Sequence, residues 1–282
     1  FFPFVVLSAP DMTLHPETGP VNKFSAEGGA SAIWETYIRY IGAGALAAGG
    51  IISLIKSLPL IVKTFGGAVK NMSASKENAE QRTAKDISIK AVLLAIAVLT
   101  ILVWLIPVIP VNIIGALIIV VFGFFFATVS SRMVGLVGSS NNPVSGMAIA
   151  TLLIATVILK LTGATGITGM CSAIAIGSVI CIVSAIAGDT SQDLKTGYLL
   201  GATPKKQQIG EIIGVIASAL AIGGTLYLLD SAWGFGNDEL AAPQATLMKL
   251  ITEGVMDGNL PWTLVFIGAF IAVLVEIVGI PV

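Results

Sequence analysis

The stretch "AVLLAIAVLTILVWLIPVIPVNIIGALIIVVFGFFFATVSS", residues 91–131, runs for its whole length without a charged side chain. A helix that crosses the hydrocarbon core of a bilayer needs about 20 apolar residues. This stretch is therefore long enough for two successive membrane-spanning helices. It predicts that the chain is a helical membrane protein.

The composition of the whole chain agrees with that prediction. Of its 282 residues, 55% are hydrophobic and 11% are charged, whereas soluble domains average about 25% charged residues. One globule cannot bury so much apolar surface, so lipid is the expected solvent and membrane lipid an expected partner. The net charge of −1 gives no reason to expect nucleic acid as a partner.

The sequence carries no pattern typical of an enzyme. It has a single histidine, His15, and it contains no HExxH, GxSxG or Walker A motif. We therefore expect no catalytic residues, no cofactor and no bound metal ion.

Seven apolar segments are predicted to cross the membrane, and the fourth of them is short. They are Ile33–Ile55, Ile87–Ile109, Val111–Ser130, Met147–Leu161, Thr165–Ala187, Ile209–Leu229 and Pro261–Ile280. The predicted fold class is all-α, with residues 1–282 in one polytopic transmembrane helix bundle. The small residues of "GAGALAAGG", 42–50, predict close helix packing in it. Because the chain starts without a methionine and ends in an apolar run, we expect an internal to C-terminal part of a longer protein.

The basic residues predict which helix ends face the cytosol. Three connections, at 63–90, 130–147 and 188–208, hold ten of the 15 Lys and Arg residues. With seven spans these connections fall on one side, and the positive-inside rule places that side in the cytosol. Residues 66–86 are thus predicted as a cytosolic loop and residues 230–260 as an extracytoplasmic loop.

The first candidate site is "VGSSNNPVSGM", Val137–Met147. A residue that precedes proline is disfavoured in helical conformation, and non-helical backbone in a bilayer must be buried in protein or line a wet cavity. Transporters use such broken helices to bind substrates. A re-entrant or broken helix is therefore predicted here, with a plain turn on the cytosolic surface as an equal alternative. The candidate substrate-binding residues are Ser139, Ser140, Asn141, Asn142 and Ser145.

The second candidate site lies in "GDTSQDLKTGYLLGATPKKQQ", residues 188–208. On a helix, Asp189, Gln192, Asp193 and Thr196 would share one polar face. A carboxylate at the membrane is a candidate for a proton or cation path. The alternative is that Asp189 caps a helix and a lysine-bearing loop follows, and spacing alone favours this alternative.

Two single acids lie within predicted spans. Glu211 is near the cytosolic end of the sixth span, and Glu276 is within the seventh. Because acids in a membrane usually face the interior of a bundle, both are candidates for proton or cation coupling.

Three stretches resemble the oligopeptide transporter (OPT) superfamily, and especially its prokaryotic branch. They are "SSNNPVSGM", "GDTSQDLKTGYLLGATPKKQQIGE" and "YIRYIGAGALAAGGIISLIKSLP", residues 37–59. The second is also similar to the "GD…QDFKTGY" stretch of yellow stripe-like metal-chelate transporters. The resemblance covers nearly all of the chain. It implies a secondary transporter in a prokaryotic plasma membrane, with further helices outside this chain.

The resemblance also implies an activity, namely proton-coupled symport of small oligopeptides or of metal-chelate and siderophore-like substrates. It favours Asp189 and Asp193 as proton or cation groups, with Gln192, Thr196 and Tyr198 as polar lining. The alternative is a passive channel with an Asn-Pro half-helix as its selectivity element. Such channels need two of these elements, and this sequence has one.

Overall fold

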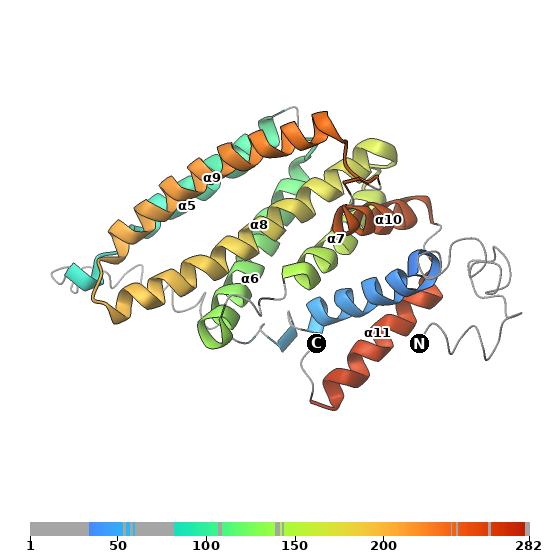
Figure 1. Cartoon of the computed structure of the whole chain (residues 1–282), viewed down its shortest axis with the longest axis horizontal. Helices are drawn as coiled ribbons and strands as arrows, with labels where there is room; N and C mark the ends of the chain where they lie inside the picture. Colours follow the sequence, from blue (N-terminus) through green and yellow to red (C-terminus); the bar gives the residue numbers. More distant parts are fainter. Residues whose placement is uncertain are drawn as a thin grey trace, which may run out of the picture.

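The structure is a computed structural model of the chain. The residues that the structure describes are 34–52, 55, 56, 59, 82–106, 109–138, 142, 144–237, 239, 240, 242–258 and 261–279. Every regular element within those ranges is helical (Figure 1).

The described helices follow one another along the chain. A π-helical turn, η1 (Trp34–Ile38), runs into a helix over 39–52, and a short 3-10 turn, η2 (Arg82–Ala84), precedes α5. The remaining helices are α5 (Ile89–Leu105), α6 (Ile113–Val137), α7 (Val144–Leu161), α8 (Gly166–Leu199), α9 (Pro204–Ala232), α10 (Pro243–Asp257) and α11 (Trp262–Ile277).

Four of these helices are long and apolar enough to cross a membrane, judged by length and composition within the described residues. They are α6, α7, α8 and α9, while α5 and α11 are shorter apolar helices. The all-α class is thus confirmed. All seven predicted spans overlap a described helix, but that all seven cross the membrane remains a prediction.

Two helices differ from the sequence-based expectation. α8 does not end near Ala187 but continues to Leu199, so the alternative in which Asp189 caps a helix is wrong. The segment 230–260, predicted as an extracytoplasmic loop, contains α10, and this helix packs on α7 and α8. The side of the membrane on which it lies remains a prediction.

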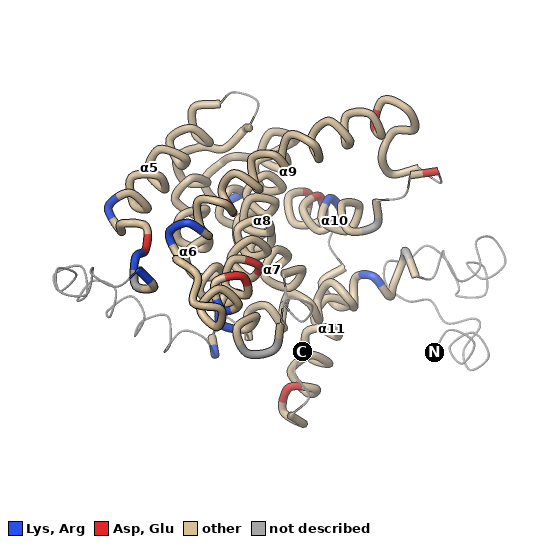
Figure 2. Tube along the Cα trace, turned by 60° about the vertical axis from the view of Figure 1, so that its left-hand side comes forward, with Lys and Arg blue, Asp and Glu red and all other residues tan. Residues whose placement is uncertain are grey.

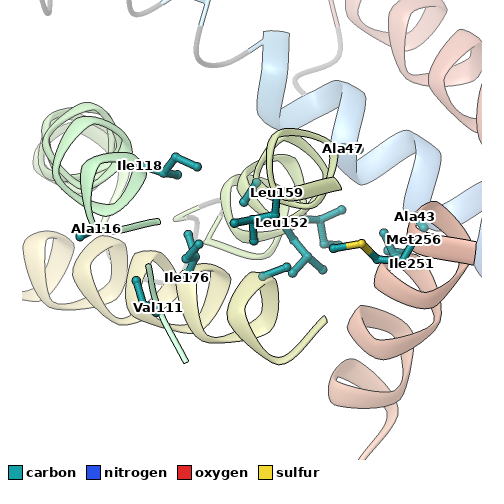
Figure 3. Close-up of a cluster of buried hydrophobic side chains, with 13 residues drawn as sticks. Ala43, Ala47, Val111, Ala116, Ile118, Leu152, Leu159, Ile176, Ile251 and Met256 are labelled. Carbon is teal, nitrogen blue, oxygen red and sulfur yellow. The ribbon is translucent and has the colours of Figure 1, made fainter. Parts of the chain in front are cut away.

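α7 occupies the centre of the bundle, between α6, α8 and α10 (Figure 1). Leu152 and Leu159 of α7 are fully buried, and they lie between Ile176 of α8 and Ile251 of α10 (Figure 3). Burial of one such side chain contributes about 1.5–3 kcal/mol where water is the alternative. Between helices in lipid that driving force is absent, so close packing has to supply the stability.

The small residues at 42–50 provide such packing, as predicted. A Cβ added to Gly44 would overlap the main chain of Val265 in α11, and one added to Gly50 would overlap the main chain of Gly146 in α7. Any side chain there would force the helices apart. The helix over 39–52 therefore holds α11 against the centre of the bundle.

α5 and α9 form the exposed side of the molecule. Neither helix has a buried residue, and both begin at the same end, where Lys205 N donates a hydrogen bond to Lys85 O (3.0 Å). In Figure 1, α9 lies on the opposite side of the bundle from α11.

Candidate functional site

The two polar motifs of the sequence meet in space. Gly188, the first residue of the second motif, is buried on α8. A Cβ at Gly188 would lie 2.8 Å from Asn142 Nδ2, 2.9 Å from Val134 Cγ2 and 3.1 Å from Ser130 Oγ. Only glycine lets α8 approach α6 and the break before α7 so closely. No pattern in the sequence predicted this contact.

Asn142 is held there by hydrogen bonds to two helices. Its Nδ2 donates to Ser130 Oγ of α6 (2.6 Å) and to the main-chain O of Ser184 in α8 (3.3 Å). Ser130 Oγ itself donates to Ser184 O. Because a carbonyl oxygen can only accept, these contacts fix which end of the Asn142 amide faces α8.

Two serines extend this contact along the same pair of helices. Ser131 Oγ donates to Ala187 O (3.0 Å), and Ser191 Oγ donates to Ser131 O (2.8 Å). Interhelical hydrogen bonds of this kind contribute about 0.6 kcal/mol each in membrane proteins. We call this set the α6–α8 polar contact; it comprises Ser130, Ser131, Asn142, Ser184, Gly188 and Ser191.

The α6–α8 polar contact leaves two buried polar atoms without a partner among the described residues, Asn142 Oδ1 and Ser184 Oγ. Ser184 is fully buried. A buried polar atom without a hydrogen bond costs about 1–3 kcal/mol, so such atoms often serve a ligand or water. The geometry is compatible with the predicted substrate-binding role of Asn142.

The other residues predicted at the break have different outcomes. Ser139, Ser140 and Asn141 lie outside the described residues, and Ser145 is exposed in the first turn of α7. A connection separates the two helices, because α6 ends at Val137 and α7 begins at Val144, and both a broken helix and a plain turn fit it. Whether it lies at membrane depth remains a prediction.

The polar face predicted for the second motif lies on a continuous helix. Asp189, Gln192, Asp193 and Thr196 all fall within α8 and are exposed, as is Tyr198. Thr196 Oγ1 donates to Gln192 O (3.1 Å) within the helix. The helical arrangement is confirmed, whereas the role of each side chain remains a prediction.

The α8–α9 hairpin brings two predicted coupling groups together. Glu211 of α9 shares a side-chain hydrogen bond with Thr190 of α8 and lies within electrostatic range of Asp193. Gln207 Nε2 donates to Asp193 O across the same hairpin. Glu211 Oε1 is buried and has no hydrogen-bond partner among the described residues. Asp193 and Glu211 are thus carried by facing turns of two adjacent helices, near one end of the bundle.

Glu276 does not join that pair. It lies in the last turn of α11 and forms an ion pair with Lys56. The structure therefore divides the predicted coupling carboxylates between two places, with Asp189, Asp193 and Glu211 on the α8–α9 hairpin and Glu276 on α11.

Comparison with known proteins identifies the family. The family model for the OPT oligopeptide transporter protein matches residues 14–281. The chain belongs to the OPT family. The resemblance carried by the three stretches is thereby confirmed, and in this OPT chain two of them meet at Asn142 and Gly188.

Three relatives extend the comparison. A putative oligopeptide transporter of Haemophilus influenzae is 31% identical over 281 residues, which cover 88% of this chain and 44% of that protein. The probable metal-nicotianamine transporter YSL5 of Arabidopsis thaliana is 35% identical over 120 residues, covering 39% of this chain and 16% of YSL5. The putative oligopeptide transporter YGL114W of Saccharomyces cerevisiae is 29% identical over 139 residues, covering 47% and 18%.

The OPT chain spans less than half the length of these curated relatives. No solved structure matches it.

Sequence reasoning missed the serines of the α6–α8 polar contact. Ser184 and Ser191 are seven residues apart, so they lie on one face of a helix, and this spacing was the available signal. Their partners, Ser130 and Ser131, lie 54 and 60 residues away, and nothing in the sequence of the OPT chain links the two pairs.

Proposed function

We propose that this chain is part of a multi-pass secondary transporter of a prokaryotic plasma membrane, which couples uptake of small oligopeptides or metal chelates to protons. Membership of the OPT family supports the proposal. So do the names of its relatives, which include an oligopeptide transporter and a metal-nicotianamine transporter. In this proposal all seven apolar segments cross the membrane, and further helices of the full-length transporter complete the path.

The observation that carries the proposal is the placement of Asp193 and Glu211 on facing turns of the α8–α9 hairpin, where Gln207 Nε2 donates to Asp193 O. Two neighbouring carboxylates repel each other when both are ionised, and one bound proton removes that repulsion. The protonated and the deprotonated pair therefore favour different separations of α8 and α9. This difference couples proton binding to helix movement.

The α6–α8 polar contact is the proposed substrate-binding site of this transporter. Asn142 Oδ1 and Ser184 Oγ are neutral groups without a partner among the described residues. An amide oxygen accepts from a peptide N–H, and a hydroxyl can donate to a peptide carbonyl. The α6–α8 polar contact and Asp193 both lie on α8. Substrate bound at the polar contact therefore shifts the helix that carries Asp193. The further proposed lining residues are Ser139, Ser140, Asn141, Ser145, Gln192, Thr196 and Tyr198.

The other two acids have different support as coupling groups. Asp189 follows Gly188 directly and shares the exposed face of Asp193. The charge of Glu276 is balanced by its ion pair with Lys56. We therefore propose Asp189, rather than Glu276, as the further group on the proton path.

The experiment that tests the proposal is uptake by the full-length protein in proteoliposomes. The probes are a pool of di- to hexapeptides and iron chelates, each offered with and without an inward proton gradient. We expect one substrate class to accumulate above its outside concentration only when the gradient is present. Equilibration that ignores the gradient would contradict the proposal and favour the passive channel.

A further inference from the structure

Four exposed lysines from two distant segments gather at the end where α5 and α9 begin. Lys85 and Lys90 belong to the segment that enters α5, and Lys205 and Lys206 lie in the first turn of α9. The hydrogen bond from Lys205 N to Lys85 O, 3.0 Å long, joins the two segments directly. Figure 2 shows that basic positions concentrate toward this end of the molecule.

Arg82 fixes this arrangement against the α8–α9 turn. Its Nη1 donates to Thr203 Oγ1 (3.0 Å) and its Nη2 to Gly201 O (2.8 Å). A third link runs from Ile87 N to Gln208 Oε1 (3.2 Å). Side-chain and main-chain contacts therefore hold the positive charges together, although more than a hundred residues separate the two segments.

The two segments that carry these lysines are mostly positive, whereas Asp193 of α8 and Glu211 of α9 lie near the same end. We call Arg82, Lys85, Lys90, Lys205 and Lys206 the basic cluster. Asp86 is the only acid in residues 82–90 and 200–210, and its Oδ1 accepts from Ile87 N. Among the described residues, the ion pairs are Lys56–Glu276 and Lys249–Glu253, so neither involves the basic cluster. The positive N-terminal end of the α9 dipole adds to the same potential.

The surface next to the basic cluster is apolar. α5 and α9 expose large side chains along their whole length, among them Leu94, Leu99, Leu220 and Leu228. The apolar part of α9 starts at Ile209, so Lys205 is only about 6 Å along the helix from it, at 1.5 Å per residue. Lysine side chains at the end of an apolar helix can extend to the headgroup layer of a bilayer.

We propose that the basic cluster is a binding site for an anionic phospholipid. The headgroup phosphate lies among the ammonium groups of Lys85, Lys90, Lys205 and Lys206, and the acyl chains lie along α5 and α9. Arg82 is a positioning residue, because both ends of its guanidinium group are bound to the α8–α9 turn. A soluble phosphate would use the charges alone, whereas a lipid also covers the adjoining apolar surface. The basic cluster shares the α8–α9 hairpin with Asp193 and Glu211, but none of its residues is among the proposed coupling or lining residues.

The test is a lipid titration of the full-length protein in detergent, read by native mass spectrometry. The probes are phosphatidylglycerol, phosphatidylcholine and inorganic phosphate. We expect wild-type protein to prefer phosphatidylglycerol. Each lysine near a membrane surface contributes about fivefold in affinity, so the double variant K205Q/K206Q should bind phosphatidylglycerol about 30-fold more weakly. Its affinity for phosphatidylcholine should not change.

Three controls separate charge at this site from general effects. The variant K205R/K206R keeps the charge and should bind as wild type does. Lys249→Gln removes a positive charge on α10 and should also leave the affinity unchanged. If K205Q/K206Q fails to fold, K85Q/K90Q gives the same test from the other segment.

Equal affinity of the wild type for the two lipids would overturn the proposal, as would phosphatidylglycerol binding that survives both double variants. Displacement of the lipid by millimolar inorganic phosphate would overturn it as well, because the site would then be specific for phosphate alone.

Discussion

α8 and α9 are the two arms of one hairpin, and they have almost the same hydropathy. Nevertheless a third of the apolar window of α8 is buried, whereas none of the window of α9 is. α8 contacts α6, α7 and α10, while α9 contacts chiefly α8. Hydropathy thus identifies helices that fit a membrane, but it does not distinguish a helix that packs on protein from one that is exposed.

α8 and α9 differ in burial because different numbers of atoms surround their glycines. At Gly188 of α8, an added Cβ would lie within 3.1 Å of atoms from three other residues. At Gly210, Gly214, Gly223 and Gly224 of α9, an added Cβ would find nothing within 4 Å. A glycine in a membrane helix therefore marks a contact only where a second helix approaches it.

Replacing one glycine on each arm should give the largest contrast. Gly188→Leu forces α8 away from Asn142 and Val134, and overpacking of this kind costs about 1–3 kcal/mol or more. Gly214→Leu should be neutral or should stabilise by about 0.5–1 kcal/mol, because leucine favours helix more than glycine does. The measurement is the free energy of unfolding in detergent. Equal effects of the two changes would show that α8 and α9 do not differ in packing.

Removing one polar side chain from each arm should give a smaller contrast. Asn142→Ala deletes the donor to Ser130 Oγ and Ser184 O, and the loss is expected to be about 1–2 kcal/mol. Thr225→Ala on α9 is the control, because its hydroxyl donates to Ala221 O of the same helix. The control should stay within about 0.5 kcal/mol of wild type. A loss in the control as large as that of Asn142→Ala would contradict the assignment.

A single serine should give the smallest contrast. Ser131→Ala removes the bond from α6 to Ala187 O, which is expected to cost about 0.6 kcal/mol. Ser218→Ala on α9, where the side chain is exposed, should have no measurable effect on the thermal midpoint. If both variants melt at the wild-type temperature, the α6–α8 polar contact owes its stability to packing and not to its hydroxyl groups.

The sequence predicted the helices better than it predicted their contacts. Apolar runs identified all seven predicted spans, and each of them overlaps a described helix. They could do so because hydropathy is a local property. The extension of α8 to Leu199 was missed, since its last turns are polar and glycine-containing and so look like a loop. α10 was missed for a similar reason, because it combines apolar with polar residues.

The candidate site was predicted in parts. Asn142 and the polar face of α8 were identified separately from local patterns. Their approach through Gly188 depends on how α6 and α8 pack, and no spacing in the chain encodes it. The short turn Leu200–Thr203 places Asp193 and Glu211 on facing turns of the hairpin. The sequence did not show that the turn is so short.

The carboxylate pair on the hairpin can be tested most directly by gradient-driven uptake of substrate by Asp193→Asn and Glu211→Gln in proteoliposomes. The matched control is Asp230→Asn, which removes an exposed acid from the last turn of α9. We predict that the first two variants lose accumulation driven by the proton gradient and keep substrate exchange, while the control accumulates as wild type does. Gradient-driven accumulation that is unchanged in both Asp193→Asn and Glu211→Gln would contradict the account.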